Sequence, residues 1–463
     1  MKIAVAGTGY VGLITGVCLA EMGYDVVCSD IREDKVLLLQ SGNAPIYEPG
    51  ITSMLKRNLD AGRLLFTADP KIAYKDADII FIAVGTPENP DGTANLDHVF
   101  EAAYTIGLNL DKDSIICTKS TVPVGTNERI KEIIHSVKPA HIEVHTASTP
   151  EFLREGNAIY DFFHGDRIVI GTESEYAVRT VEQLFLPLKI PIVNTDIRSA
   201  EMIKYASNAF LATKISFINE IAAICDKVGA NIEEVAFGIG KDRRIGPQFL
   251  QAGIGYGGSC FPKDTKALVQ IAGDVEHQFE LLEAVIKVNS RQQAITVQKA
   301  KELFGSLEGL RVAVLGLAFK PDTDDIREAA SLTILRGLLS EGASVIAYDP
   351  VAVPNARIIF ENAIDYTTNI ETAISGAELV IIATEWDHIK HQPLEKYVQL
   401  MKKPIIIDGR NCYSLREVSK HSITYYSIGR SSTQSKMAEW HHKPPILTRE
   451  GRFDETFTSI LPN

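Results

Sequence analysis

The feature of this sequence that most constrains its fold is an alternation of short apolar runs with longer helical patterns. Each run is followed by a glycine-rich or polar turn and usually by a helical pattern. This alternation is typical of a parallel sheet covered by helices on both faces. In the first part of the chain, the runs with the composition of buried strands are 2–6, 25–28, 79–84, 114–118 and 167–170.

The alternation stops in the middle of the chain and then resumes. Between 197 and 229 the apolar residues recur at helical intervals, which predicts one long helix or two short ones, and more helix follows from 266 to 304. Strand-like runs return after Gly309, at 310–315, 344–348, 379–384 and 404–408.

We therefore predict an α/β protein with two Rossmann-like, doubly wound parallel-sheet domains joined by a central helical region. The predicted units are an N-terminal dinucleotide-binding domain at 1–196, a helical region at 197–305, a second Rossmann-like domain at 306–430 and an irregular tail at 431–463.

Composition narrows the function classes. The six cysteines are scattered without metal-ligand spacing, which predicts free thiols, no metal site and a cytoplasmic protein. A net charge of −12 argues against binding to nucleic acid or to an anionic membrane. No stretch approaches the roughly 18 apolar residues of a membrane span, and four glycines break the apolar N-terminus, as a strand–loop–helix requires and a signal peptide does not.

The first strand leads into a GxGxxG turn made by Gly7, Gly9 and Gly12. In a dinucleotide-binding turn the first glycine allows the tight bend, the second lets the backbone approach the pyrophosphate, and the third lets helix and strand pack closely. The free N–H groups of the following helix then favour the anion. Asp30 ends the second strand, where a carboxylate binds the ribose hydroxyls and repels a 2′-phosphate, so NAD is predicted over NADP, although Arg32 lies nearby.

The second Rossmann-like domain begins with a shorter motif. Gly316 follows the strand, but the second and third glycines of the fingerprint are absent. A mononucleotide fits this pattern better than a dinucleotide, with Lys320 contacting a phosphate, and a duplicated scaffold without a ligand is the alternative.

The segment 253–264, GIGYGGSCFPKD, contains the cysteine with the most reactive surroundings. Four glycines within it form a tight loop that can close over a ligand. Cys260 has Lys263 and Asp264 beside it and precedes a predicted helix, and both a lysine and a helix N-terminus favour the nucleophilic thiolate. The other five cysteines are predicted to be inert core residues.

Polar clusters at 120–125, 150–156 and 204–208 lie where loops or helix faces could meet the cysteine loop. Lys204 and Asn208 are four residues apart and share a helix face. From spacing alone, Lys204 could point either into the site or toward solvent.

Eight ordered motifs between 1 and about 430 identify a family resemblance. The chain resembles the UDP-glucose/GDP-mannose dehydrogenase family, and the form of its cysteine loop is similar to that of the branch acting on UDP-glucose. The motifs are GTGYVG at 7–12, IYEPG at 46–50, VGTP at 84–87, KSTVPVG at 119–125, PEFLREG at 150–156, GYGGSCFPKD at 255–264, FKPDTDDIRE at 319–328 and TEW at 384–386.

The resemblance implies a four-electron oxidation of the C6 alcohol of UDP-glucose to a carboxylate, with two NAD molecules used in turn. Cys260 would form a thiohemiacetal with the intermediate aldehyde and then a thioester, which water hydrolyses. The alternative within the family is a 6-dehydrogenase for GDP-mannose or a UDP-N-acetylhexosamine. A binding protein without catalysis is the alternative from another class.

The resemblance also implies roles for individual residues. Lys204 and Asn208 would stabilise the oxyanion, and Asp264, Glu151 and Thr121 would position water and take protons, without an order between Asp264 and Glu151 as the base. The implied cofactor contacts are Gly7, Gly9, Tyr10, Val11, Gly12, Asp30, Lys35, Thr86, Thr121, Glu155, Lys263 and Arg327. The implied substrate contacts are Phe152, Leu153, Arg154, Glu155, Lys204, Arg244, Phe249, Leu250, Gly253, Gly257, Phe319 and Lys320. Arg244 would reach the substrate of a partner subunit, which implies a homodimer.

Overall fold

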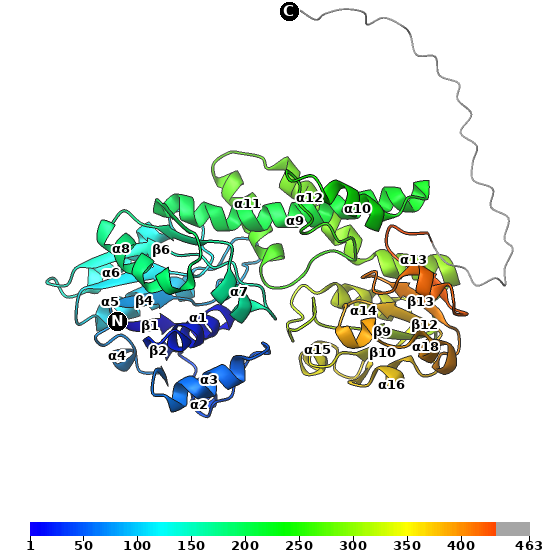
Figure 1. Cartoon of the computed structure of the whole chain (residues 1–463), viewed down its shortest axis with the longest axis horizontal. Helices are drawn as coiled ribbons and strands as arrows, with labels where there is room; N and C mark the ends of the chain where they lie inside the picture. Colours follow the sequence, from blue (N-terminus) through cyan, green and yellow to red (C-terminus); the bar gives the residue numbers. More distant parts are fainter. Residues whose placement is uncertain (432–463) are drawn as a thin grey trace, which may run out of the picture.

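Two sheet domains lie side by side under a layer of helices (Figure 1). The computed structural model describes residues 1–431, so the predicted tail at 431–463 falls, apart from Ser431, outside the described residues. The N-terminal domain, blue to cyan in Figure 1, and the C-terminal domain, yellow to orange, are bridged by the long green helix α9. The predicted fold class is confirmed by this arrangement.

The N-terminal domain is built on an eight-stranded sheet with the order β3-β2-β1-β4-β5-β6-β7-β8. Strands β1 to β6 pair in parallel, whereas β7 pairs antiparallel with β6, so β7 and β8 run against the others. The strands are β1 (Lys2–Ala6), β2 (Asp25–Ser29), β3 (Leu64–Thr67), β4 (Ile79–Ile82), β5 (Ser114–Thr118), β6 (Val144–Ser148), β7 (Ile168–Gly171) and β8 (Ile192–Thr195). The helices are α1 (Tyr10–Glu21), α2 (Glu33–Gln40), α3 (Ile51–Asp60), α4 (Pro70–Ala73), α5 (Asp97–Asn109), α6 (Thr126–Val137), α7 (Ala158–His164) and α8 (Glu175–Phe185), followed by the 3₁₀ turn η1 (Leu186–Leu188).

The central region contains one long helix rather than two. Helix α9 spans Ile197–Val228, starts where the Asp196 side chain accepts a hydrogen bond from the Ser199 N–H, and ends at Gly229, whose φ of 76° terminates it. The other central helices are α10 (Ile232–Gly240), α11 (Phe261–Asp274), α12 (Glu280–Gln293) and α13 (Ile295–Phe304).

The C-terminal domain repeats the first architecture on a smaller scale. Its six-stranded parallel sheet has the order β11-β10-β9-β12-β13-β14. The strands are β9 (Arg311–Leu315), β10 (Ser344–Tyr348), β11 (Asp365–Thr367), β12 (Leu379–Ile382), β13 (Ile405–Asp408) and β14 (Thr424–Tyr426). The helices are α14 (Ala330–Ser340), α15 (Val353–Phe360), α16 (Ile370–Ile374), α17 (Asp387–Lys390), α18 (Leu394–Leu400) and α19 (Leu415–Val418).

Buried aliphatic side chains of the central strands hold both domains together. Strand β4 is buried along its whole length, and so is β12. Their neighbours β1 and β9 bury four of five residues each. Such continuous apolar strands are characteristic of parallel sheets covered on both faces. No helix of the described residues is long and apolar enough to cross a membrane.

Close packing at the first glycine turn depends on the absence of side chains. A Cβ on Gly12 would lie 2.0 Å from the Gly7 carbonyl oxygen, whereas a Cβ on Gly9 would meet nothing within 4 Å. Gly7 itself has a φ of 94°, which favours glycine. The turn is therefore constrained for two different reasons, contact at Gly12 and conformation at Gly7.

We predict that Gly12→Ala lowers the free energy of unfolding by about 1–3 kcal/mol, because the added methyl group must displace backbone. The matched variant Gly9→Ala should lose less than about 1 kcal/mol, mainly from a poorer helix N-cap. Urea denaturation followed by circular dichroism measures both. Equal losses in the two variants would contradict this account of the turn.

Candidate active site

The N-terminus of α1 is open toward the carboxyl edge of the first sheet. Gly9 is the N-cap of α1 and makes no side-chain capping bond, so the first N–H groups of the helix are available to an anion. The open space where a Gly9 side chain would stand lets a phosphate approach the backbone. These residues fit the pyrophosphate of a dinucleotide.

Asp30 lies at the end of β2 beside this turn. Its Oδ2 accepts hydrogen bonds from the Thr8 N–H at 3.1 Å and from the Thr8 hydroxyl at 2.6 Å, and it forms an ion pair with Lys35 at 3.0 Å. The carboxylate is thus fixed where the ribose of a dinucleotide binds in this fold, and Lys35 is held with it. Arg32 points away and pairs with Asp34 at 2.6 Å, both being exposed.

In the second sheet, the carboxylate at the corresponding position is occupied by hydrogen-bond donors from the same chain. Asp349 follows β10 and is fully buried. Its carboxylate accepts hydrogen bonds from the backbone of Leu317, Ala318, Val351 and Ala352. It also accepts one from the indole N–H of Trp386 at 3.1 Å. No acceptor is left for a ribose, so the residues of this domain do not fit a dinucleotide.

A cavity of about 620 Å³ lies between the glycine turn, the cysteine loop and the segment that precedes α14. It brings together predicted residues from six separate parts of the chain. Those that line it are Gly9, Tyr10, Val11, Thr86, Thr121, Glu151, Leu153, Glu155, Cys260, Lys263, Asp264 and Arg327.

The cysteine loop is held by contacts on both sides. The Asn289 side chain of α12 accepts a hydrogen bond from the Tyr256 N–H at 2.8 Å and donates one to the Tyr256 carbonyl at 3.0 Å. The Gly258 N–H donates to the Arg327 carbonyl at 2.9 Å. A Cβ on Gly257 would lie 2.3 Å from the Glu328 carbonyl oxygen, so this glycine permits the close approach.

Cys260 is the N-cap residue of α11 and lines the cavity. Burial, with the charges of Asp264 and Glu151, raises the pKa of this thiol to about 11, although Lys204 and a hydrogen bond with Ser259 act in the other direction. The sequence predicted surroundings that favour the thiolate, and this prediction is wrong for the ligand-free protein. The prediction failed because the thiol is buried and because the Lys263 ammonium pairs with Asp264 at 2.6 Å.

Two buried carboxylates flank the cysteine, and each is partnered. The Lys204 ammonium of α9 donates to Glu151 Oε1 at 2.9 Å, with both side chains at most 6% exposed. The Asn208 amide, one helical turn later, donates to Asp264 Oδ2 at 2.7 Å. Burial alone would lower the pKa of Lys204, but the nearby negative groups outweigh it and raise the pKa. Lys204 therefore points into the site, which spacing alone left open.

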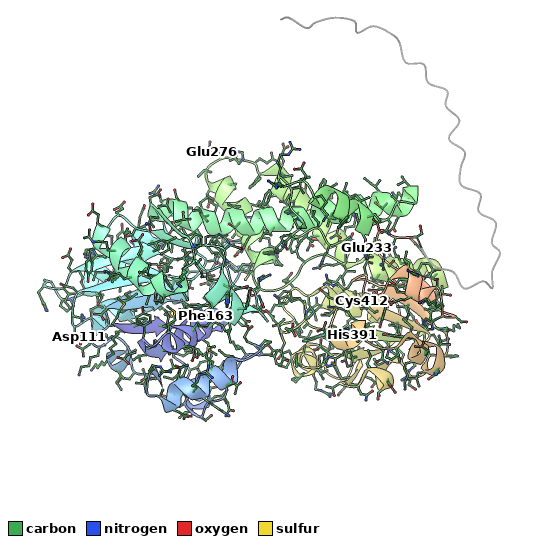
Figure 2. The ribbon with its side chains drawn as sticks, in the orientation of Figure 1. Asp111, Phe163, Glu233, Glu276, His391 and Cys412 are labelled. Atoms are coloured by element: carbon green, nitrogen blue, oxygen red, sulfur yellow. The ribbon has the colours of Figure 1, made fainter. Side chains whose placement is uncertain are left out.

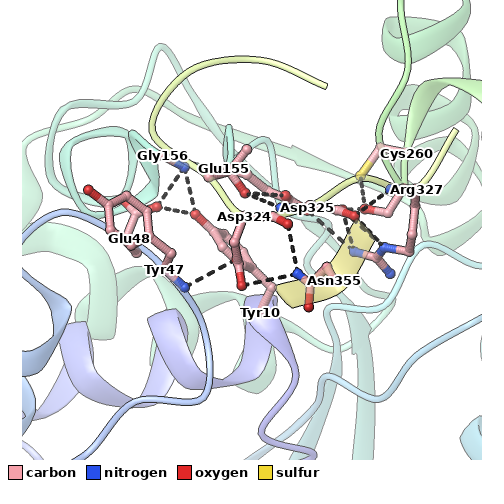
Figure 3. Close-up of polar contacts among 12 residues, drawn as sticks. Tyr10, Tyr47, Glu48, Glu155, Gly156, Cys260, Asp324, Asp325, Arg327 and Asn355 are labelled. Atoms are coloured by element: carbon pink, nitrogen blue, oxygen red, sulfur yellow. Dashed lines mark hydrogen bonds and ion pairs between the residues drawn. The ribbon is translucent and has the colours of Figure 1, made fainter. Parts of the chain in front are cut away.

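Glu155 joins three parts of the molecule (Figure 3). It accepts hydrogen bonds from the Ser259 hydroxyl at 3.1 Å and the Thr323 hydroxyl at 3.3 Å, and lies 3.7 Å from Arg327. Burial and the charge of Asp325 raise the pKa of Glu155 to about 7, against the opposing charge of Arg327. Beside it, the Gly156 N–H donates to Tyr10 and Glu48.

Several predicted substrate residues lie around the cavity rather than in its lining. Phe152 stacks its ring against Arg167 at 3.6 Å, and the Lys204 ammonium lies 5.3 Å from the same ring. The Lys320 ammonium lies 5.5 Å from the Phe319 ring, and burial lowers its pKa. Arg154 pairs with Asp161 at 2.6 Å.

The segment before the cysteine loop contains three more of these residues. Leu250 is buried, Phe249 lies 6.3 Å from the ring of Phe261, and Gly253 donates its N–H to Asn219 at 2.9 Å. Arg244 is not brought to the cavity of its own chain. Its side chain is 89% exposed and pairs with Asp242.

Sequence reasoning assigned no role to two polar residues that line the cavity, Lys119 and His98. Lys119 follows β5 directly, and His98 lies on α5. Position at the carboxyl end of a parallel strand was a usable signal for Lys119. Ser120, from the predicted polar cluster at 120–125, also lines the cavity. None of the five other cysteines lines the cavity. Four of them are buried, as predicted for core residues, whereas Cys412 is half-buried and lies in the C-terminal domain (Figure 2).

All three parts of the chain match one family. Residues 1–189 match the UDP-glucose/GDP-mannose dehydrogenase family, NAD binding domain. Residues 198–291 match the central domain of that family, and residues 313–415 match its UDP binding domain.

Similar proteins extend over almost the whole chain. The UDP-glucose 6-dehydrogenase YwqF of Bacillus subtilis is 56% identical over 93% of this chain and 98% of its own length. A UDP-glucose 6-dehydrogenase of Rhizobium meliloti is 46% identical over 93% of this chain and 100% of its own length. The structure of a UDP-glucose dehydrogenase from Pyrobaculum islandicum superposes with a TM-score of 0.87 at 37% identity, covering 93% of this chain and 98% of that one.

The raised pKa of Cys260 leads to a direct prediction for the ligand-free protein. With a pKa of about 11, only about one thiol in ten thousand is ionised at pH 7. The rate of alkylation of Cys260 by iodoacetamide should therefore rise about tenfold per pH unit from pH 7 to 10. Lys204→Met should slow it at every pH, because loss of the cation raises the pKa further. Peptide mass mapping identifies the modified cysteine, and a plateau below pH 8 would refute the assignment.

Proposed function

The chain belongs to the UDP-glucose/GDP-mannose dehydrogenase family, and we propose that it oxidises UDP-glucose to UDP-glucuronate with two molecules of NAD. The observation that carries the proposal is the convergence of Cys260, Asp264 and Glu151 on one cavity that the dinucleotide turn also lines. A single oxidation of an alcohol has no step for a nucleophilic thiol, whereas a thiol that adds to the aldehyde provides a route to the acid at one site.

NAD, when bound, accepts the hydride in each oxidation. The residues assigned to hold it are the glycine turn with Tyr10 and Val11, then Asp30, Lys35, Thr86, Thr121, Glu155, Lys263 and Arg327. In the first oxidation, C6 loses a hydride while its hydroxyl proton passes through water to Asp264 or Glu151. The charge that develops on oxygen is stabilised by Lys204, which is already buried and needs no reorganisation.

In the second oxidation the Cys260 sulfur adds to the aldehyde carbon while the thiol proton passes to the aldehyde oxygen, which gives a thiohemiacetal. This adduct still has a hydrogen on C6, and its loss as hydride produces the thioester while the hydroxyl proton leaves to a carboxylate. Burial raises the pKa of Cys260 to about 11, and Lys204 is the cation that acts against this rise, so we assign it to favour the thiolate during the addition.

Hydrolysis of the thioester completes the reaction. Water adds to the acyl carbon and gives a proton to Glu151 or Asp264, the C–S bond breaks, and the leaving sulfur takes that proton, which returns the Cys260 thiol and releases the acid. Thr121 and Asn208 are assigned to position the water and the oxyanion. Both carboxylates are held by cations or amide donors, so they remain available as proton acceptors without moving.

The C-terminal domain is proposed to hold the UDP part of the substrate. Asp349 accepts a hydrogen bond from Trp386 and has no acceptor left for the ribose of a dinucleotide. We therefore assign a mononucleotide to the end of this sheet, with Lys320 contacting a phosphate. The residues assigned to the sugar and nucleotide are Phe152 to Glu155, Lys204, Phe249, Leu250, Gly253, Gly257, Phe319 and Lys320. The relatives with 56% and 46% identity favour UDP-glucose over other nucleotide sugars.

We place the reaction in the cytoplasm, where the six free thiols of this chain would stay reduced. The protein is proposed to act as a homodimer. Helix α9 exposes an apolar stripe in which Phe210, Phe217 and Ile224 recur every seven residues and are each more than half exposed. Apolar side chains repeated along one face of a helix in this way fit a second copy of the same helix. Arg244, which is exposed in its own chain, would then reach the partner's substrate.

Substrate and stoichiometry are tested together by NADH formation from UDP-glucose, GDP-mannose, UDP-N-acetylglucosamine and UDP-N-acetylmannosamine, with product masses determined in parallel. Two NADH per UDP-glucose and a uronic acid product are expected. Two NADH from another sugar would overturn the substrate assignment, and binding without NADH from any of them would indicate a protein that retains the fold without the chemistry.

Phe217→Asp should weaken self-association by roughly 30-fold or more, because it places a charge in an apolar contact. The matched control is Ile358→Asp on α15, a residue 79% exposed and outside the stripe, which should leave association unchanged. Sedimentation velocity over a concentration series measures both. A wild-type protein that sediments as a monomer at every concentration would contradict the proposed dimer.

A further inference from the structure

Glu48 is a buried carboxylate to which the proposed reaction assigns no role, although it lies in the IYEPG motif of the sequence. Its side chain is only 5% exposed. Its Oε1 accepts hydrogen bonds from the Ala158 N–H at 2.7 Å and the Ile159 N–H at 3.3 Å. Its Oε2 accepts one from the Gly156 N–H at 2.6 Å and one from the Tyr10 hydroxyl. Donors from two separate segments of the chain therefore meet on one buried side chain.

These contacts connect the cofactor turn to the segment assigned to the sugar (Figure 3). Tyr10 is the first residue of α1 and lines the cavity, and its hydroxyl also accepts a hydrogen bond from the Gly156 N–H at 2.8 Å. Tyr10, Glu48 and Gly156 are thus joined to one another pairwise by hydrogen bonds. Because Gly156 directly follows Glu155, the end of the 152–155 segment is positioned from the cofactor turn.

Gly156 is also a point at which the first domain packs closely against the second. Its φ of 78° favours glycine, and a Cβ there would lie 2.5 Å from the Asp322 carbonyl oxygen. One residue earlier, Glu155 accepts hydrogen bonds from Thr323 and from Ser259 of the cysteine loop. A shift of the Gly156 backbone would therefore disturb the contacts that Glu155 makes across the cavity.

We propose that Glu48 is a positioning residue for the reaction, which holds the Gly156 backbone against Tyr10 and thereby fixes the 152–155 segment where the UDP-sugar binds. This inference rests on the proposed function. A carboxylate suits this position because both of its oxygens accept hydrogen bonds, whereas a glutamine side chain accepts at its oxygen and donates at its nitrogen. In either orientation of the amide, Glu48→Gln would leave part of the surrounding backbone N–H groups facing another donor.

The test measures UDP-glucose binding by isothermal titration calorimetry in wild type and in Glu48→Gln. We expect Kd to rise roughly tenfold, because a segment that is no longer held in place must be ordered when the ligand binds. KM for UDP-glucose should rise by a similar factor, with kcat changing less than about threefold, since ground-state and transition-state binding are weakened alike. A merely structural role would lower the melting temperature or the active fraction and leave Kd unchanged.

Tyr10→Phe provides an independent variant, because it keeps the ring and removes the hydroxyl. It should raise Kd for UDP-glucose about threefold. The double variant should bind within about twofold of Glu48→Gln alone, because both changes act on the same Gly156 N–H and their effects are not additive. If Glu48→Gln does not fold, Tyr10→Phe alone decides, and an unchanged Kd in this variant contradicts the proposal.

The matched control is Glu201→Gln on α9. Glu201 is 2% exposed, does not line the cavity, and accepts hydrogen bonds from the Gly125 N–H at 2.7 Å and the Asn127 N–H at 2.9 Å. This variant should bind UDP-glucose within about twofold of wild type, whatever its melting temperature.

Three results would overturn the role of Glu48: an unchanged Kd in Glu48→Gln, an equal loss of binding in Glu201→Gln, or a double variant whose loss is the product of the single losses. A wild type that binds no UDP-glucose would instead overturn the proposed function.

Discussion

The buried ion pair between Lys204 and Glu151 is the interaction on which the rest of the site depends. It joins α9 to the segment after β6, and both charges are almost fully removed from water. Taking away one member of such a pair costs about 3–5 kcal/mol, because the other charge is left buried and unpaired. The pair therefore fixes the register of α9 against the first sheet, and Asn208, one turn later on the same helix, is fixed to Asp264 with it. Cys260 thus lies among groups that are already ordered.

The two sheet domains of this chain share one architecture but differ in a few contacts. The positive φ of Gly7 is repeated at Gly316, with φ values of 94° and 99°. In the first domain Asp30 is held by Thr8 at the open edge of the sheet, whereas in the second domain the indole N–H of Trp386 donates a hydrogen bond to the Asp349 carboxylate. The first domain therefore keeps an acceptor for a ribose at this position, whereas the second has none. The cavity between them draws on both domains through Glu155, which bonds to Ser259 and Thr323.

Much of this could be predicted from the sequence because the signals are local. Glycine spacing predicts the turn before α1, and periodicity predicts the sheets and α9. Three features could not be predicted from local signals, because they depend on contacts between distant residues or on side-chain orientation. The antiparallel direction of β7 depends on pairing with β6, the pairing of Lys263 with Asp264 depends on side-chain orientation, and the buried state of Lys119 depends on residues 30 positions away. The lowered pKa expected for Cys260 failed for the same reason, since burial is a tertiary property.

The covalent role of Cys260 is the central claim of this account, and it is tested most directly by supplying the aldehyde form of UDP-glucose with NAD to Cys260→Ala and to Cys412→Ala. The second variant removes a thiol that lies outside the cavity and serves as the control. The account predicts one NADH and a uronic acid from Cys412→Ala, and less than about one thousandth of that rate from Cys260→Ala, because the thiohemiacetal that donates the second hydride cannot form without the thiol. Oxidation of the aldehyde by Cys260→Ala at the rate of the control would contradict it.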